Sequence, residues 1–96
     1  VQASLRNLDE AALVQAIKDA LASDPGFARQ ASAELRRRGA ADARLRGLAD
    51  KFDGIVAYRA GNFPQAEADY RRALPAFRAA GDQREEANVL NNLGVL

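Results

Sequence analysis

Apolar residues recur along this chain at intervals of three and four, which is the period of a helix with one buried face. Short polar or glycine-containing segments interrupt the pattern and divide it into five stretches. The pattern therefore predicts five helices, beginning near Leu8, near Pro25, near Ala41, near Phe63 and just after Asp82. Connections of only two to four residues between such helices predict antiparallel neighbours.

Capping residues support these helix starts. Asn7 with Glu10 has the spacing of a capping box, and Asp82 with Glu85 repeats that spacing. Asp24 is expected to cap the second helix because a proline follows it at the first helical position. The sequence thus predicts where the first, second and fifth helices begin.

Glycine and proline predict where helices end or bend. Gly39 follows three arginines and is expected to end the second helix in a left-handed conformation. Gly61 and Asn62 separate the third helix (41–60) from the fourth (63–80), and Asn62 is expected to cap the fourth. Pro75 lies deep in the fourth helix, where the missing N–H predicts a kink over residues 71–74.

These elements predict three units: a helical hairpin over residues 1–40, a second hairpin over residues 41–81, and a single helix over residues 82–96. An apolar stripe on the third helix predicts that it packs partly against the first two. It consists of Leu45, Leu48, Phe52 and Ile55. The last helix is expected to leave an open apolar face made of Val89, Leu90, Leu93 and Leu96. Such a face indicates that the chain is a fragment of a longer protein in which further helical hairpins cover it. The alternative is that another chain buries this face.

Composition strengthens the all-α prediction and narrows the chemistry. Hydrophobic residues form 48% of the chain, mostly alanine and leucine, and these two residues lead the scale of helix propensity. The sequence has no cysteine and no histidine, so it lacks thiolate chemistry and the commonest general base and metal ligand. We therefore expect no catalytic residue, metal or cofactor.

Net charge is +1, which gives no overall field toward nucleic acid or anionic membranes. The one basic cluster is expected to be a solvated helix end, because no aromatic residue is interleaved with it. It comprises Arg36, Arg37, Arg38, Arg44 and Arg46. The start of the chain lacks the order of a signal peptide, and no apolar run reaches the length of a membrane span. These features predict neither a nucleic-acid nor a membrane partner and favour the cytoplasm.

A repeated pattern runs from about residue 48 to residue 96. Two glycines lie forty residues apart in helix interiors, where each is expected to face a closely packed neighbouring helix. A turn glycine and a small, aromatic, small series lie between them. The positions are Gly54, Gly61, Ala66, Tyr70, Ala73 and Gly94. This pattern resembles the forty-residue subclass of the tetratricopeptide repeat family. The resemblance implies a superhelix of antiparallel helical hairpins, with Asp50 and Asp53 standing where the family usually has apolar residues.

The resemblance also implies a function, because proteins of this family bind peptides on the concave surface lined by the first helix of each repeat. The residues that would lie there are Lys51, Ile55, Tyr58, Arg59, Asn88, Asn91, Asn92 and Val95. Asparagine suits this role because its side chain both donates and accepts hydrogen bonds. Lys51 and Asn92 match two of the five positions with which some members bind a terminal carboxylate.

The sequence therefore favours a non-enzymatic protein-interaction module that binds a peptide or protein in a groove. A structural role is the alternative, in which chains pair through the open faces of the first and last helices. A sensor region attached to an effector domain is a third possibility. If the candidate surface has no binding role, Lys51 and Arg59 are expected to be solvated, Ile55 to belong to the core, and the asparagines to make contacts between repeats.

Overall fold

The computed structural model describes residues 2–96, with side chains from Leu5 onward. Its helical segments are α1 (Gln2–Asn7), α2 (Glu10–Ala20), α3 (Pro25–Arg38), the 3₁₀ helix η1 (Gly39–Ala41), α4 (Ala43–Arg59), α5 (Phe63–Ala80) and α6 (Gln83–Gly94). No strand occurs in this described range, and the predicted all-α class is confirmed. The short helix α1 was not predicted.

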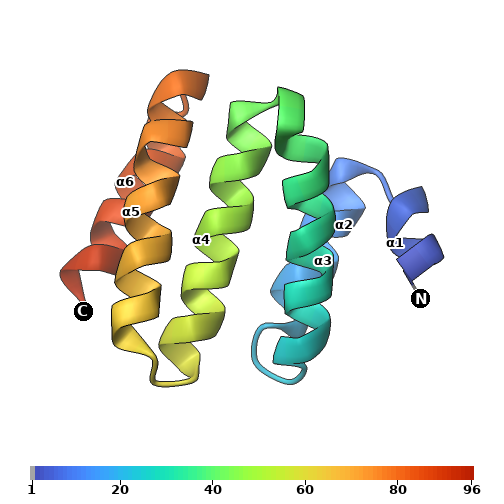
Figure 1. The fold of residues 1–96 in the computed structure, drawn as a ribbon, viewed down its shortest axis with the longest axis horizontal. Helices are drawn as coiled ribbons and strands as arrows, with labels where there is room; N and C mark the ends of the chain where they lie inside the picture. Colours follow the sequence, from blue (N-terminus) through green and yellow to red (C-terminus); the bar gives the residue numbers. More distant parts are fainter. Residues whose placement is uncertain (1) are drawn as a thin grey trace.

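The helices form two layers (Figure 1). Helices α3, α4 and α5 lie side by side with alternating direction, and α4 occupies the middle. Helix α2 lies behind α3, α6 lies behind α5, and α1 sits at the edge next to α3. Helix α4 packs on both α3 and α5, so the prediction that it contacts the N-terminal hairpin is confirmed.

The start of α2 differs from the prediction. Asp9, not Asn7, is the N-cap, and its carboxylate accepts a hydrogen bond from the backbone N–H of Ala12 at 2.8 Å. The expected capping box with Glu10 is wrong, because Asn7 belongs to α1 and Glu10 accepts a hydrogen bond from Arg44 at 2.6 Å. A separate helix in the first residues therefore moves the cap by two positions.

The predicted caps at Asp24, Asn62 and Asp82 are confirmed. Each side chain accepts a hydrogen bond from the backbone N–H three residues later, at 3.1, 3.3 and 3.1 Å respectively. The capping box at Asp82 is only half formed, because the carboxylate of Glu85 binds Lys51 instead of turning back toward the helix start. An ammonium group from α4 thus replaces a backbone N–H as its partner.

Gly39 does not take the left-handed conformation that we predicted. Its φ is −74°, and the chain continues into η1 before Asp42 caps α4. A Cβ atom on Gly39 would lie 2.8 Å from the backbone nitrogen of Arg46, so a close approach of the chain explains this glycine. Gly61 does adopt the left-handed conformation, with a φ of +79°. Helix α5 continues through Pro75.

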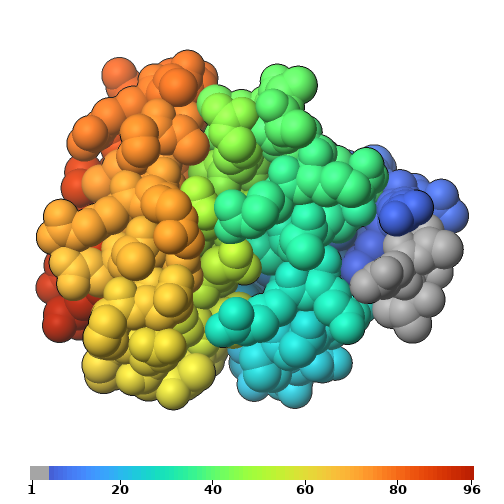
Figure 2. All heavy atoms as spheres, viewed as in Figure 1, coloured from blue at the N-terminus to red at the C-terminus, as the bar shows by residue number. Residues whose placement is uncertain are grey.

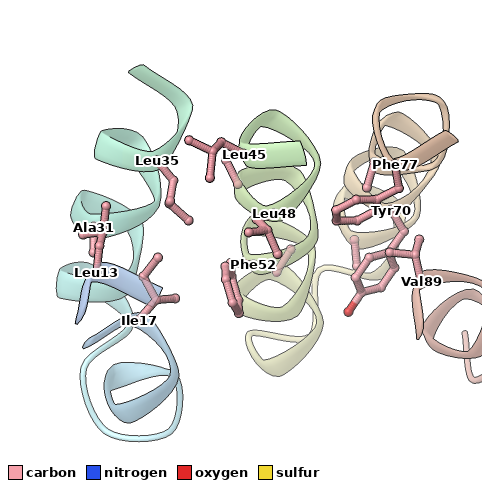
Figure 3. Close-up of a cluster of buried hydrophobic side chains, with 14 of the residues drawn as sticks. Leu13, Ile17, Ala31, Leu35, Leu45, Leu48, Phe52, Tyr70, Phe77 and Val89 are labelled. Carbon is pink, nitrogen blue, oxygen red and sulfur yellow. The ribbon is translucent and has the colours of Figure 1, made fainter. Parts of the chain in front are cut away.

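One continuous apolar core joins α2 through α6 (Figure 3). Its largest fully buried side chains come from five different helices. They are Leu13, Ile17, Leu35, Phe52, Phe77 and Val89. At roughly 1.5–3 kcal/mol for each large apolar side chain, this burial is the main stabilising contribution of the fold.

Helices α4 and α5 approach closely because glycines of α4 face aromatic rings of α5. A Cβ atom on Gly47 would lie 2.7 Å from the ring of Phe77, and one on Gly54 would lie 2.6 Å from the ring of Tyr70. Because helix neighbours repeat about every seven residues, the two pairs form successive contacts along one interface. Figure 3 places both rings among the core side chains between α4 and α6.

The apolar face expected on α6 is narrower than the sequence suggested. Val89 is fully buried and belongs to the core, and Leu93 is partly buried against it. Leu90 and Leu96 remain 48% and 43% exposed. The expectation that all four residues share one open face is therefore wrong, because α6 turns Val89 inward against α5.

A polar network joins α3, α4 and α5 on the other side of the core. The guanidinium of Arg36 donates to Asp50 at 2.8 Å and to Asp53 at 2.7 Å. Asp69 accepts from Gln65 and from Arg72, and its burial raises the pKa of its carboxyl above the ordinary value. The two aspartates of α4 are thus held by an arginine of the N-terminal hairpin.

Candidate functional site

Five of the eight candidate binding residues line one hollow of about 410 Å³ between α4 and α6. They are Ile55, Tyr58, Arg59, Asn92 and Val95. Tyr70 of α5 also contributes to the wall. The hollow has apolar, aromatic, amide and cationic groups on its surface, so it offers both packing and hydrogen bonding. We call it the α4–α6 hollow.

Two helix ends bring these residues together. Ile55, Tyr58 and Arg59 belong to the last two turns of α4, and their spacing places them on neighbouring faces of the helix. Asn92 lies in the last turn of α6, and Val95 caps that helix. Because the two helices contribute from opposite sides, the hollow depends on how α6 is held against α4.

Lys51 holds α6 to α4. Its ammonium group donates to the two carboxylate oxygens of Glu85 at 2.8 and 3.2 Å. It also lies 4.8 Å from the ring centre of Phe52. Asn88 donates to the same carboxylate at 3.3 Å. Lys51 is only 8% exposed, so this residue connects the two helices and does not line the hollow.

The three remaining candidates lie outside the α4–α6 hollow. Asn91 is exposed but does not line the α4–α6 hollow, and neither does Asn88. Lys51 and Asn92, which the resemblance placed in a carboxylate site, do not line a common hollow. The structure therefore brings together the residues near the ends of α4 and α6 and leaves Lys51, Asn88 and Asn91 outside.

Two tyrosines, Tyr58 and Tyr70, belong to the wall of the hollow. The ring of Tyr58, 37% exposed, packs at 5.4 Å against that of Phe63, which is 51% exposed. Burial raises the pKa of the Tyr70 hydroxyl above the ordinary tyrosine value, so this group stays protonated at neutral pH. Tyr70 can therefore donate a hydrogen bond, and its ring also packs on Gly54.

A second hollow of about 210 Å³ lies on the opposite side of α4, toward α2. Its lining residues are Leu21, Ala22, Pro25, Val56, Arg59 and Ala60. We call it the α2–α4 hollow. Sequence reasoning missed it, because the α2–α3 connection approaches the end of α4 only through the tertiary fold. Arg59 lines both hollows, and each has apolar side chains beside it.

Contacts within the chain engage every arginine of the basic cluster, four through carboxylates and one through a backbone carbonyl. Each of its arginines donates to a protein oxygen: Arg36 to Asp50, Arg37 and Arg38 to Glu34, Arg44 to Glu10, and Arg46 to the carbonyl of Gly39. On the face in Figure 2, α4 is recessed between α3 and α5. A hollow of about 350 Å³ there has Arg46 and Arg72 beside Asp50. Acidic partners thus accompany its cations.

A further hollow of about 420 Å³ lies between α5 and α6. Its apolar lining comes from Leu74, Leu90, Leu93 and Leu96, with Glu67 and Arg71 also in the wall. Glu67 and Arg71 are paired with each other at 2.8 Å. This surface is the remaining part of the apolar face that was expected on α6.

Three glutamates of α5 and α6 are each paired with a cation of the chain. Glu67 pairs with Arg71, Glu86 with Arg78 at 2.6 Å, and Glu85 with Lys51. Among the described residues, no group of three or more acidic side chains is placed to hold a metal ion. No helix in residues 2–96 is both long and apolar enough to cross a bilayer.

The repeat-defining residues have different surroundings. Ala66 and Ala73 are fully buried, and Gly54 packs against Tyr70. Gly94 is the last residue of α6, and a Cβ atom there would meet nothing within 4 Å. The expectation of a close helix at Gly94 is thus not met within the described chain.

Comparison with protein-family models, curated proteins and solved structures finds no match to this chain.

Proposed function

We propose that this chain is a non-enzymatic protein-interaction module that binds a peptide or a protein segment in the α4–α6 hollow. One observation supports the proposal most: five of the eight residues that the family resemblance implied line the same hollow of about 410 Å³. Ile55 and Val95 provide apolar surface, while Asn92 and Tyr70 provide hydrogen-bonding groups. This combination suits an extended segment, whose backbone groups need polar partners and whose side chains need apolar ones.

We also propose that α4, α5 and α6 correspond to a tetratricopeptide hairpin followed by the first helix of the next repeat. The close contact of Gly54 with Tyr70 and the burial of Ala66 and Ala73 support it. The left-handed Gly61 between α4 and α5 agrees with the family's turn glycine. In that arrangement the α4–α6 hollow lies between two first helices, where family members bind their partners.

The binding experiment uses a library of random linear peptides selected against the immobilised chain. Selected peptides are then labelled, and fluorescence anisotropy gives their dissociation constants. We expect Tyr58→Ser to weaken binding about tenfold or more, because it removes one aromatic wall of the hollow. Circular dichroism of the variant checks that the helices remain.

Phe63→Ser is the matched control for that variant. Phe63 packs against Tyr58 and is also exposed, but it does not line the hollow. Both substitutions remove the same aromatic contact, and only Tyr58→Ser changes the wall. Equal loss of binding in the two variants, or a library that yields no specific peptide, would contradict the proposed function.

An alternative function is pairing of two chains through the surface between α5 and α6. The exposed Leu90 and Leu96, together with Leu93 and Leu74, support it. Exposed apolar patches of this kind are frequent at protein interfaces. Static light scattering over a range of concentrations tests the alternative.

Under the pairing alternative, the native chain is a dimer and Leu90→Glu is a monomer. Under the main proposal, Leu90→Glu leaves both the molar mass and the peptide affinity unchanged. Leu90 suits this test better than Leu93, because Leu93 is partly buried against the core and its substitution would also disturb folding.

A further inference from the structure

We propose that the two hollows beside Arg59 together bind one extended protein segment in which an acidic side chain lies between two apolar side chains. The inference rests on the proposed function of the α4–α6 hollow and specifies its partner. It extends the binding surface across the end of α4 to the α2–α4 hollow, and it assigns the central contact to Arg59.

The two hollows lie beside the last turns of α4. Helix α4 lies between the α2–α3 hairpin and the α5–α6 pair (Figure 1). The α4–α6 hollow, about 410 Å³, opens on one side of its last turns, and the α2–α4 hollow, about 210 Å³, opens on the other. Arg59 lines both. A ligand that fills both hollows must therefore pass over Arg59.

The charge of Arg59 favours an acidic group on the partner. Seven arginines of the described chain form ion pairs with carboxylates: Arg36, Arg37, Arg38, Arg44, Arg71, Arg72 and Arg78. Among the described residues, no carboxylate pairs with Arg59, and neither hollow has an acidic residue in its lining. The position of Arg59 in the last turn of α4 favours a cation but supplies no counter-ion. A carboxylate from a partner complements this surface.

Each hollow has apolar side chains in its lining. Ile55 and Val95 lie in the larger hollow, and Leu21 and Val56 lie in the smaller one. In an extended segment every second side chain points to the same side, at a repeat of about 6.6–6.8 Å. An apolar, spacer, acidic, spacer, apolar order therefore presents one carboxylate and two flanking apolar groups to one surface.

The test uses short peptides in which leucine, serine, aspartate, serine and leucine follow one another between glycine–serine flanks. The peptides are acetylated and amidated, so their only carboxylate is the aspartate side chain. Fluorescence anisotropy against the full chain measures affinity. We expect at least about a tenfold loss when asparagine replaces the aspartate, because the charge-assisted hydrogen bonds to Arg59 are lost. A comparable loss is expected when serine replaces either leucine.

Arg59→Gln is the decisive variant. It should weaken the aspartate peptide about tenfold and leave the asparagine peptide nearly unchanged, because only the former has a carboxylate for Arg59. Arg29→Gln is the matched control, since Arg29 is also exposed and has no ion pair in the described chain but lines neither hollow. The control should bind both peptides as the native chain does.

Several outcomes overturn this inference without affecting the proposed function. Equal affinity for the aspartate and asparagine peptides excludes the acidic centre. Equal losses in Arg59→Gln and Arg29→Gln exclude a specific role for Arg59. If library peptides bind and Tyr58→Ser abolishes their binding, but the peptides carry no acidic residue between apolar ones, then the groove is real and the partner class is wrong. If no peptide binds at all, both proposals are wrong.

Discussion

Gly54 and Gly94 occupy equivalent places in the forty-residue spacing, but their surroundings differ. At Gly54 the ring of Tyr70 leaves no room for a side chain, whereas at Gly94 nothing lies within 4 Å of an added Cβ atom. The sequence predicted both glycines as contacts with a neighbouring helix. Only the tertiary fold shows which of the two has such a neighbour in this chain.

Alanine substitutions separate the two glycines. We expect Gly54→Ala to lower the free energy of unfolding by about 1–2 kcal/mol, because the cost of overpacking exceeds the gain in helix propensity. Gly94→Ala should be neutral or stabilising by up to about 1 kcal/mol. Urea unfolding followed by circular dichroism measures both values. Equal effects of the two substitutions would show that the contact with Tyr70 does not explain Gly54.

Glu34 gives a pH-dependent contribution to stability. Hydrogen bonds from Arg37, and then from Arg38, lower the pKa of its carboxyl to about 2. Because the pKa in the folded state lies below that in the unfolded state, the stabilisation is complete above the ordinary value of 4.5 and is lost as the pH falls toward 2. Arg38 also donates to the carbonyl of Leu5 at 3.0 Å, so this network reaches α1.

Glu34→Gln tests that contribution. At neutral pH the variant should unfold at a lower urea concentration than the native chain. The difference between the two should shrink as the pH is lowered from about 4.5 to about 2, since the native carboxyl then becomes neutral as well. A difference that stays constant over this range would mean that the ionised carboxylate of Glu34 does not stabilise the fold.

At the scale of single elements, local signals predicted most helix boundaries. Asp24, Asn62 and Asp82 cap the helices that follow them because a side-chain oxygen needs only the next few backbone N–H groups. Glu85 was misjudged, because its preferred partner comes from α4. The separate helix α1 was missed as well, and Asp9 took the capping role given to Asn7.

Removing the ion pair between Lys51 of α4 and Glu85 of α6 tests how α6 is held against α4. Lys51→Met keeps the apolar stem but leaves the carboxylate of Glu85, 19% exposed, without its cation. We expect a loss of about 1–3 kcal/mol in the free energy of unfolding, because a largely buried charge then lacks its partner. Differential scanning calorimetry or urea unfolding measures the loss.

Lys18→Met is the control for this substitution. Lys18 is exposed on α2 and has no ion pair in the described part of the chain, so the same change there should alter stability by no more than about 0.5 kcal/mol. If Lys51→Met is equally mild, then the ion pair does not hold α6 against α4, and another contact must define the α4–α6 hollow.

At the scale of the whole molecule, the all-α class predicted from the sequence is confirmed. Of the eight residues expected on one surface, five line the α4–α6 hollow and Lys51, Asn88 and Asn91 do not. Helical periodicity placed Ile55, Tyr58 and Arg59 near one another because they share the last turns of one helix. Their position beside Asn92 and Val95 was expected only from the family resemblance, and the structure places all five around one hollow. The α2–α4 hollow could not be predicted, because residues 21–25 reach the end of α4 only after the hairpins pack together.

The proposed function requires that the α4–α6 hollow is a binding surface for another protein. The most direct measurement is a titration of the isotope-labelled chain with a library-selected peptide, followed by two-dimensional NMR of backbone amides. We predict chemical-shift changes concentrated at Ile55, Tyr58, Arg59, Asn92 and Val95, with residues around Leu90 unaffected. Shift changes that centre on Leu90 and Leu96, or that spread evenly over the chain, would contradict the account.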